Sequence, residues 1–82
     1  MAQQFSQQQI KTRTAVLVFV KGSAAPIVLY VENPQTLYSE FVTAMKSATP
    51  VVIEKETMGP IKKVSVISNQ ISGVALQDEQ YV

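Results

Sequence analysis

The sequence contains no cysteine, no histidine and no tryptophan. Without cysteine there are no disulfide bonds, thiolate nucleophiles, iron–sulfur clusters or zinc fingers. Without histidine the commonest general base and metal ligand is missing. No Walker, dinucleotide-binding, G-x-S-x-G or H-E-x-x-H motif is present, and the three glycines are too isolated to cradle a phosphate. We therefore expect no enzymatic activity, no cofactor and no metal ion.

Charge is also scarce, since 16% of the 82 residues are charged where soluble domains usually carry about 25%. Seven Lys and Arg residues against six Asp and Glu residues give a formal net charge of +1, which predicts no general attraction for polyanions. The longest apolar run, Ala15 to Val20, is far shorter than the roughly 20 residues that span a bilayer. The first residues show no secretory signal pattern. We expect a cytoplasmic protein without a membrane partner.

The length fits one domain. Residues 1–9 hold five glutamines and no convincing period, so we predict a flexible, Gln-rich N-terminal tail. Residues 10–80 contain neither an internal repeat nor a linker and are predicted to form a single α+β domain. At 46% hydrophobic residues, such a chain can cover one sheet with one helix.

Two β-rich segments, residues 10–21 and 26–32, predict a hairpin whose loop is residues 21–25. Both segments are apolar on both faces, which is typical of strands buried on both sides. The predicted register places Leu17 opposite Leu29 and Phe19 opposite Ile27 on the face covered by a helix. The other face then receives two pairs, Val16 opposite Tyr30 and Val18 opposite Val28.

Asn33-Pro34 is a strong helix-start signal, because asparagine is a good N-cap residue and proline suits the first helical position. The following residues to Ala48 predict a helix of about 14 residues. Its apolar stripe is Leu37, Phe41, Met45 and Ala48. Thr49-Pro50 closes the helix, since the residue before proline disfavours the helical conformation.

Three further strands are predicted after the helix, at residues 51–56, at residues 61–67 and after Gln70. A turn around Met58-Gly59 places Glu54 opposite Lys63. A three-residue loop, Ser68 to Gln70, with Asn69 in the left-handed conformation, then places Val64 opposite Val74. The predicted architecture is β-β-α-β-β-β, with one helix packed on a mainly antiparallel sheet.

One helix can cover only one face of this sheet, so the other face is predicted to be an apolar interaction surface made of Val16, Val18, Val28 and Tyr30. We expect it to drive formation of a homo-oligomer, with a dimer favoured, through sheet faces or by edge pairing. Tyr30 is the expected anchor. Strong curling of the sheet, which would close the later strands over that face, is the alternative structure. The sequence thus predicts a protein–protein interaction or regulatory module.

Binding of single-stranded nucleic acid (RNA or DNA) by the same face is the alternative function. It requires an exposed aromatic ring for base stacking beside cations that contact phosphates. Lys11, Arg13, Lys21 and Tyr30 are the residues that could supply these groups. No RRM or KH motif accompanies them, and the basic character of the chain is weak.

Overall fold

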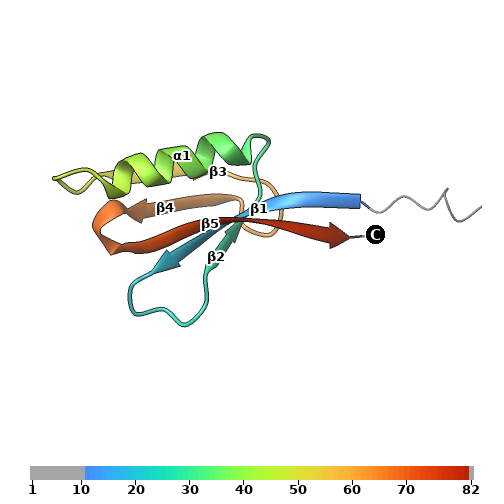
Figure 1. Cartoon of the computed structure of the whole chain (residues 1–82), viewed down its shortest axis with the longest axis horizontal. Coiled ribbons are helices and arrows are strands. Elements are labelled where there is room, and N and C mark those ends of the chain that lie inside the picture. Colours follow the sequence, from blue (N-terminus) through green and yellow to red (C-terminus); the bar gives the residue numbers. More distant parts are fainter. Residues whose placement is uncertain (1–10, 82) are drawn as a thin grey trace, which may run out of the picture.

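Within residues 11–81, the fold is a small α+β domain with one α-helix and five strands. The computed structural model describes residues 11–81 (Figure 1). The elements, in chain order, are β1 (Lys11–Val20), β2 (Ile27–Leu29), α1 (Pro34–Met45), β3 (Val52–Glu56), β4 (Lys63–Ile67), a 3₁₀ turn (Ser68–Gln70) and β5 (Ile71–Tyr81). The predicted fold class and element order are confirmed. The predicted tail, residues 1–9, lies outside the described residues.

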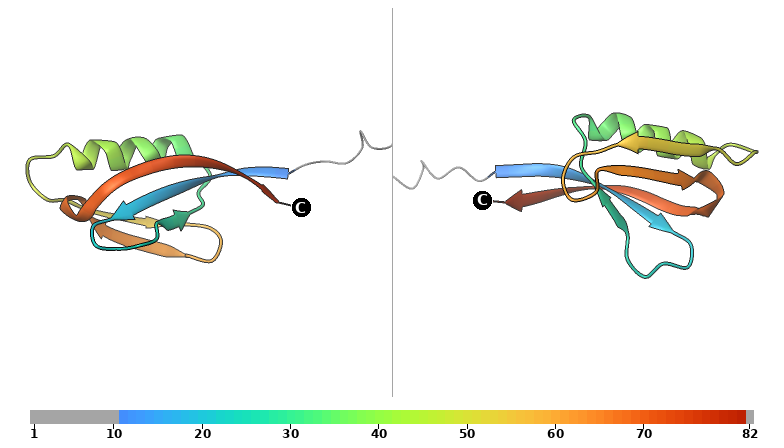
Figure 2. Two further views of the ribbon diagram at one scale, coloured as in Figure 1. Left: turned by 60° about the horizontal axis from the view of Figure 1, so that its bottom comes forward. Right: turned by 180° about the vertical axis from the view of Figure 1, so that it is seen from behind.

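The strands form two antiparallel sheets. One has the order β2-β1-β5, and the other contains β3 and β4. The central strand β1 pairs with β5 along its whole length, from Lys11 opposite Tyr81 to Val20 opposite Ile71. The two sheets meet where the backbone N–H of Met58 donates to the Tyr30 carbonyl at 2.7 Å. The paired ends of β1 and β5 extend beyond the helix (Figures 1 and 2).

Helix α1 begins at Pro34 directly after Asn33, as predicted, although the Asn33 side chain makes no capping hydrogen bond. It ends at Met45 rather than at the predicted Ala48. There the N–H of Ser47 bonds to the Ala44 carbonyl, a three-residue spacing that tightens and ends the helix. No helix within residues 11–81 has the length and apolarity to cross a membrane.

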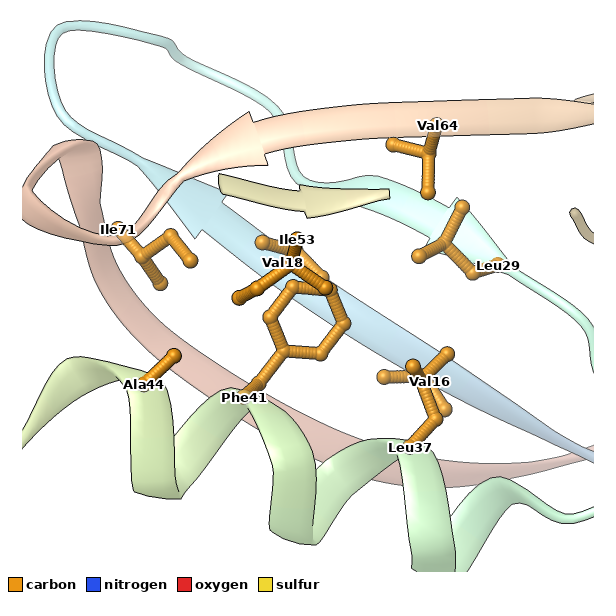
Figure 3. Close-up of a cluster of buried hydrophobic side chains, with 9 residues drawn as sticks. All are labelled: Val16, Val18, Leu29, Leu37, Phe41, Ala44, Ile53, Val64 and Ile71. Atoms are coloured by element: carbon orange, nitrogen blue, oxygen red, sulfur yellow. The ribbon is translucent and has the colours of Figure 1, made fainter. Parts of the chain in front are cut away.

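The core lies between α1, the β2-β1-β5 sheet and the β3–β4 hairpin (Figure 3). Phe41 is fully buried at its centre, and Met45, which the predicted stripe included, is 36% exposed. The helix contributes Leu37, Phe41 and Ala44, and the strands contribute Val16, Val18, Leu29, Ile53, Val64 and Ile71. The β3–β4 hairpin therefore shares the core under the helix instead of closing over the opposite face of the larger sheet.

The predicted register of the first hairpin is wrong by one residue. Leu17 lies opposite Val28, and Val16 lies opposite Leu29. The shift begins at the turn from Val20 to Ser23, where the Ser23 N–H bonds to the Val20 carbonyl at 3.1 Å and Gly22 takes a φ of 79°. A one-residue shift exchanges the two faces of a strand. It therefore moves the predicted surface residues of β1 into the core.

The predicted pairing of the last two strands is also wrong, because β4 pairs with β3 while β5 pairs with β1. Asn69 is not left-handed, since no non-glycine residue in the described part has a positive φ. Instead, the buried Ser68 is fixed to Val51, directly before the start of β3. Its N–H donates to the Val51 carbonyl at 2.8 Å, and its hydroxyl accepts from the Val51 N–H at 3.0 Å. This anchored turn directs β5 away from β4.

The β3–β4 register differs from the prediction by two residues, so that Glu56 rather than Glu54 lies opposite Lys63. The faces are unchanged because side chains alternate with a period of two. Glu54 still reaches Lys63 diagonally, with their charged atoms 3.6 Å apart. Both side chains are more than half exposed, so this pair contributes little to stability.

Candidate interaction surface

The side of the β2-β1-β5 sheet that faces away from α1 is here called the reverse face. Strand alternation and the pairing of β1 with its neighbours assign its residues. None of them belongs to the core cluster under the helix. From β1 they are Arg13, Ala15, Leu17 and Phe19, from β2 and its end Val28 and Tyr30, and from β5 Gly73, Ala75, Gln77 and Glu79.

The apolar half of the reverse face is centred on Leu17 and Phe19. Ala15 is fully buried and Leu17 is 9% exposed, whereas the larger Phe19 is 38% exposed. Phe19 lies opposite Gly73, and a side chain at Gly73 would begin 3.8 Å from the Phe19 ring. The ring thus covers a glycine of the edge strand, an arrangement that stabilises such a position. Phe19 leaves part of its own ring in solvent.

The polar half contains a cluster of Arg13, Tyr30 and Glu79. The guanidinium carbon of Arg13 lies 3.9 Å from the centroid of the Tyr30 ring, within cation–π distance. The Tyr30 hydroxyl donates to Glu79 Oε1 at 2.7 Å, and Arg13 Nε lies 3.5 Å from the same oxygen. The three side chains come from three adjacent strands, so the cluster ties them together.

The environment of Tyr30 raises its pKa above the usual value of a tyrosine. The main cause is the hydrogen bond to the Glu79 carboxylate, followed by desolvation, while the charge of Arg13 acts in the opposite direction. The hydroxyl is therefore held in its protonated, donating form. It serves as a structural donor and not as a base.

A shallow cavity of about 460 Å³ lies beside Tyr30. Its walls include Arg13, Glu32, Pro34 and Met58. Gly59 has a φ of 88°, and a Cβ atom there would lie 3.0 Å from Tyr30 Cδ2. A glycine is thus required both by the turn and by the close approach of this loop to the ring.

The structure divides the predicted interaction surface between two faces. Val16 and Val18 are fully buried in the core beneath α1, so their assignment to the surface is wrong. Val28 and Tyr30 do lie on the reverse face, and both are partly exposed. Tyr30 already binds Arg13 and Glu79.

The structure does not gather the cations of the alternative nucleic-acid surface. Lys11 and Lys21 lie at opposite ends of the ten-residue strand β1. Arg13 covers the Tyr30 ring that a base would need for stacking. Among residues 11–81 no group of three or more acidic side chains is placed to hold a metal ion.

Sequence reasoning missed Leu17 and Phe19, because the shifted register placed them under the helix. The sequence does hold a local signal for part of this register shift. Residues Val20 to Ser23 form a turn whose third position requires a positive φ, and glycine occupies that position. That signal fixes where β1 ends. It does not fix which residue of β2 lies opposite Val18, because the rest of the loop has no defined turn type.

Comparison with known proteins finds partial similarity to curated proteins. A UPF0367 protein of Rippkaea orientalis (strain PCC 8801 / RF-1) is 44% identical over 52 residues, or 58% of this chain. A UPF0367 protein of Crocosphaera subtropica (strain ATCC 51142 / BH68) is 49% identical over 53 residues, or 60% of this chain. Each alignment covers 55% of the relative, so the chain spans about half the length of the curated relatives it matches. No family model and no solved structure matches the chain.

Proposed function

We propose that the chain is a non-catalytic protein–protein interaction module that self-associates through the reverse face of its larger sheet. The supporting observation is Phe19, which is 38% exposed on this face beside the partly exposed Val28, on a strand that is apolar and uncharged from Ala15 to Phe19. The helix and the β3–β4 hairpin both pack on the opposite face. Burying an apolar sheet face against a second copy stabilises a dimer by about 25 cal/mol for each Å² removed from water.

Phe19 is the proposed anchor of this contact. It is 38% exposed and lies in an uncharged neighbourhood of Leu17, Val28 and Gly73. Tyr30 serves less well, because its hydroxyl and ring face already have partners within the subunit. Large aromatic residues near the centre of an interface commonly contribute most of its binding free energy.

Sedimentation equilibrium of the purified chain near neutral pH tests the proposal. We expect the wild type to be a dimer or larger, and Phe19→Glu to shift the equilibrium toward a smaller species. Val52→Glu is the matched control, since Val52 is also an exposed strand residue, at 62%, but lies on the outer side of β3. It should leave the size unchanged.

A wild type that stays monomeric at high micromolar concentration would exclude self-association. Equal effects of the Phe19 and Val52 substitutions would show that the reverse face is not the contact.

Single-stranded nucleic acid remains the alternative ligand of this face, with weaker support. The Arg13–Tyr30 contact and the separation of Lys11 from Lys21 both count against it. A labelled oligonucleotide at low salt provides the test. Binding that falls steeply as salt rises would favour this alternative over self-association.

A further inference from the structure

The outer edge of β5 is the longest unpaired strand edge in the described part of the chain. β5 has eleven residues and pairs on one side only, with β1. The irregularity in that pairing lies at its start, between Phe19 and Val20, so the ladder from Gly73 to Tyr81 is regular. Figure 2 shows β5 as a long strand that runs past the helix. A regular, unpaired edge of this kind can accept another strand.

The first part of this edge, before Asp78 and Glu79, lacks most of the features that usually protect a free edge. Lysine, proline and very short length are the common protections. The segment Ile71–Tyr81 contains no lysine, arginine or proline. By contrast, the opposite edge strand β2 has only three residues and follows Pro26, and the β3–β4 hairpin carries Lys55 and Lys63. The edge of β5 is therefore the one left open to pairing.

A groove between α1 and β5 lies beside this edge. It has a volume of about 460 Å³ and is lined by Gly73 and Val74 from β5 and, along α1 and just after it, by Tyr38, Val42, Met45 and Lys46. Apart from Lys46 and Gly73, the residues that line the groove have largely apolar side chains. An open strand edge next to an apolar groove is the geometry by which proteins add an extended segment to a sheet.

We propose that this edge binds β5 of a second copy of the chain in antiparallel orientation, with the twofold axis at Ala75. In this register Val74 lies opposite Leu76 of the second copy, and the reverse holds by symmetry. Both residues already pack against the core from the helix side of the sheet. The two pairs would join the cores of the two subunits through one six-stranded sheet.

Charge favours a second β5 as the occupant. Asp78 and Glu79 are the charged residues of β5 and lie in its second half. Antiparallel pairing places them opposite the uncharged first half of the other strand, with Asp78 opposite Ser72. That position is near Lys46, which lines the groove beside Gly73. Asp78 uses Oδ1 to accept a hydrogen bond from Thr14 at 2.8 Å, and its other oxygen remains for this lysine.

This edge contact does not depend on the proposed reverse-face contact. Pairing through β5 leaves the reverse face open, and the two copies present their reverse faces on the same side of the joined sheet. A stack of two such dimers through their reverse faces gives a closed tetramer with three twofold axes. The structure thus assigns two separable interfaces to one chain.

Sedimentation of variants separates the two contacts. Phe19→Glu should convert a wild-type tetramer to a dimer held by β5. Adding Met45→Glu, which places a carboxylate in the groove, should convert that dimer to a monomer. Adding Thr43→Glu instead is the control, because Thr43 is exposed on the same helix but does not line this groove. Circular dichroism establishes that each variant is folded.

Three results overturn the edge contact. In the first, the Phe19→Glu variant is monomeric, and the groove would then be a binding site for a segment of another protein. In the second, the Phe19→Glu dimer survives Met45→Glu. In the third, the wild type is monomeric, and the reverse-face proposal fails with it. A wild-type dimer that Phe19→Glu does not affect and Met45→Glu dissociates would support the edge contact and exclude the reverse-face contact.

A single introduced cysteine tests the register, because the chain has none of its own. In the Phe19→Glu background, Ala75→Cys should form an intermolecular disulfide on mild oxidation, since directly opposed residues lie about 4.5–5.5 Å apart. Gln77→Cys is the control on the same strand and face. Its two copies would be separated by about four residues, or ~13 Å, and should crosslink at least tenfold more slowly. Absence of the Ala75→Cys crosslink overturns this register.

Discussion

At the scale of single residues, Tyr30 connects several parts of the molecule through its backbone and its side chain. Its backbone carbonyl accepts from Met58, its ring lies under Arg13, and its hydroxyl donates to Glu79. Gly59 permits this arrangement because it has no Cβ atom where the loop meets the ring. Tyr30 therefore joins the two sheets and three strands at one point.

Gly59→Ala should destabilise the fold more than Gly22→Ala. Both glycines have a positive φ, which costs a non-glycine residue about 1–2 kcal/mol. A Cβ atom at Gly22 meets nothing within 4 Å, whereas one at Gly59 lies 3.0 Å from the Tyr30 ring. Urea unfolding should show a larger loss of unfolding free energy for Gly59→Ala, and equal losses would contradict the close approach.

The raised pKa of Tyr30 predicts a loss of stability in alkali. Because the folded state holds the proton more tightly, the contribution is fully present below the ordinary tyrosine pKa of about 10. It is lost as the pH rises through the higher pKa of the folded state. Unfolding free energy measured above pH 10 should fall more steeply for the wild type than for Tyr30→Phe.

Glu79→Gln supplies the matched variant, because it removes the carboxylate that is the main cause of the shift. It should bring the pKa of Tyr30 closer to 10. If the unfolding free energy falls equally steeply above pH 10 in the wild type and in both variants, the hydrogen bond to Glu79 does not raise the pKa of Tyr30.

At the scale of elements, the sequence correctly predicted the features that depend on residues close together in the chain. Asn33-Pro34 correctly marked the start of α1, and Leu37 and Phe41 were correctly placed on its buried stripe. The β1–β2 register depended on loop residues with no unique turn type, and a shift of one residue exchanged Val18 for Leu17 on the reverse face. For this reason the site was only partly predictable.

Phe41→Ala should test the core that α1 forms with the strands. Phe41 is fully buried. Replacing such a side chain by alanine typically lowers the unfolding free energy by about 3–5 kcal/mol, because a cavity is left behind. Thr43→Ala, at an exposed position of the same helix, should change the unfolding free energy by about 0.5 kcal/mol or less. Similar losses for both variants would contradict the observed orientation of the helix.

At the scale of the whole molecule, β1 is the central strand of the larger sheet and the β3–β4 hairpin is a separate two-stranded unit. The sequence did not predict the β1–β5 pairing, because it joins segments far apart in the chain while hairpins join neighbours. The local pattern instead favoured a β4–β5 hairpin, whereas the structure bonds Ser68 to Val51 and pairs β4 with β3. Only tertiary contacts could have distinguished these alternatives.

Hydrogen exchange should reveal two levels of stability. The amides of Val16, Leu17 and Val18 lie between two paired strands and should exchange slowest. The amides of Val52–Glu56 belong to the separate two-stranded sheet, in which each strand has a partner on one side only. They should exchange at least about tenfold faster, which corresponds to a difference of ~1.4 kcal/mol in opening free energy. Uniform protection would show that the two sheets open as one unit.

The pairing of Lys11 with Tyr81 affects how the chain folds as it is made. About seventy residues of synthesis separate these two positions, which takes roughly 4–14 s at typical translation rates. During that interval β1 has been synthesised and β5 has not, so the apolar run from Ala15 to Val20 lacks its main partner. We therefore expect the apolar face of β1 to be most prone to non-native contacts before β5 is available to pair with it.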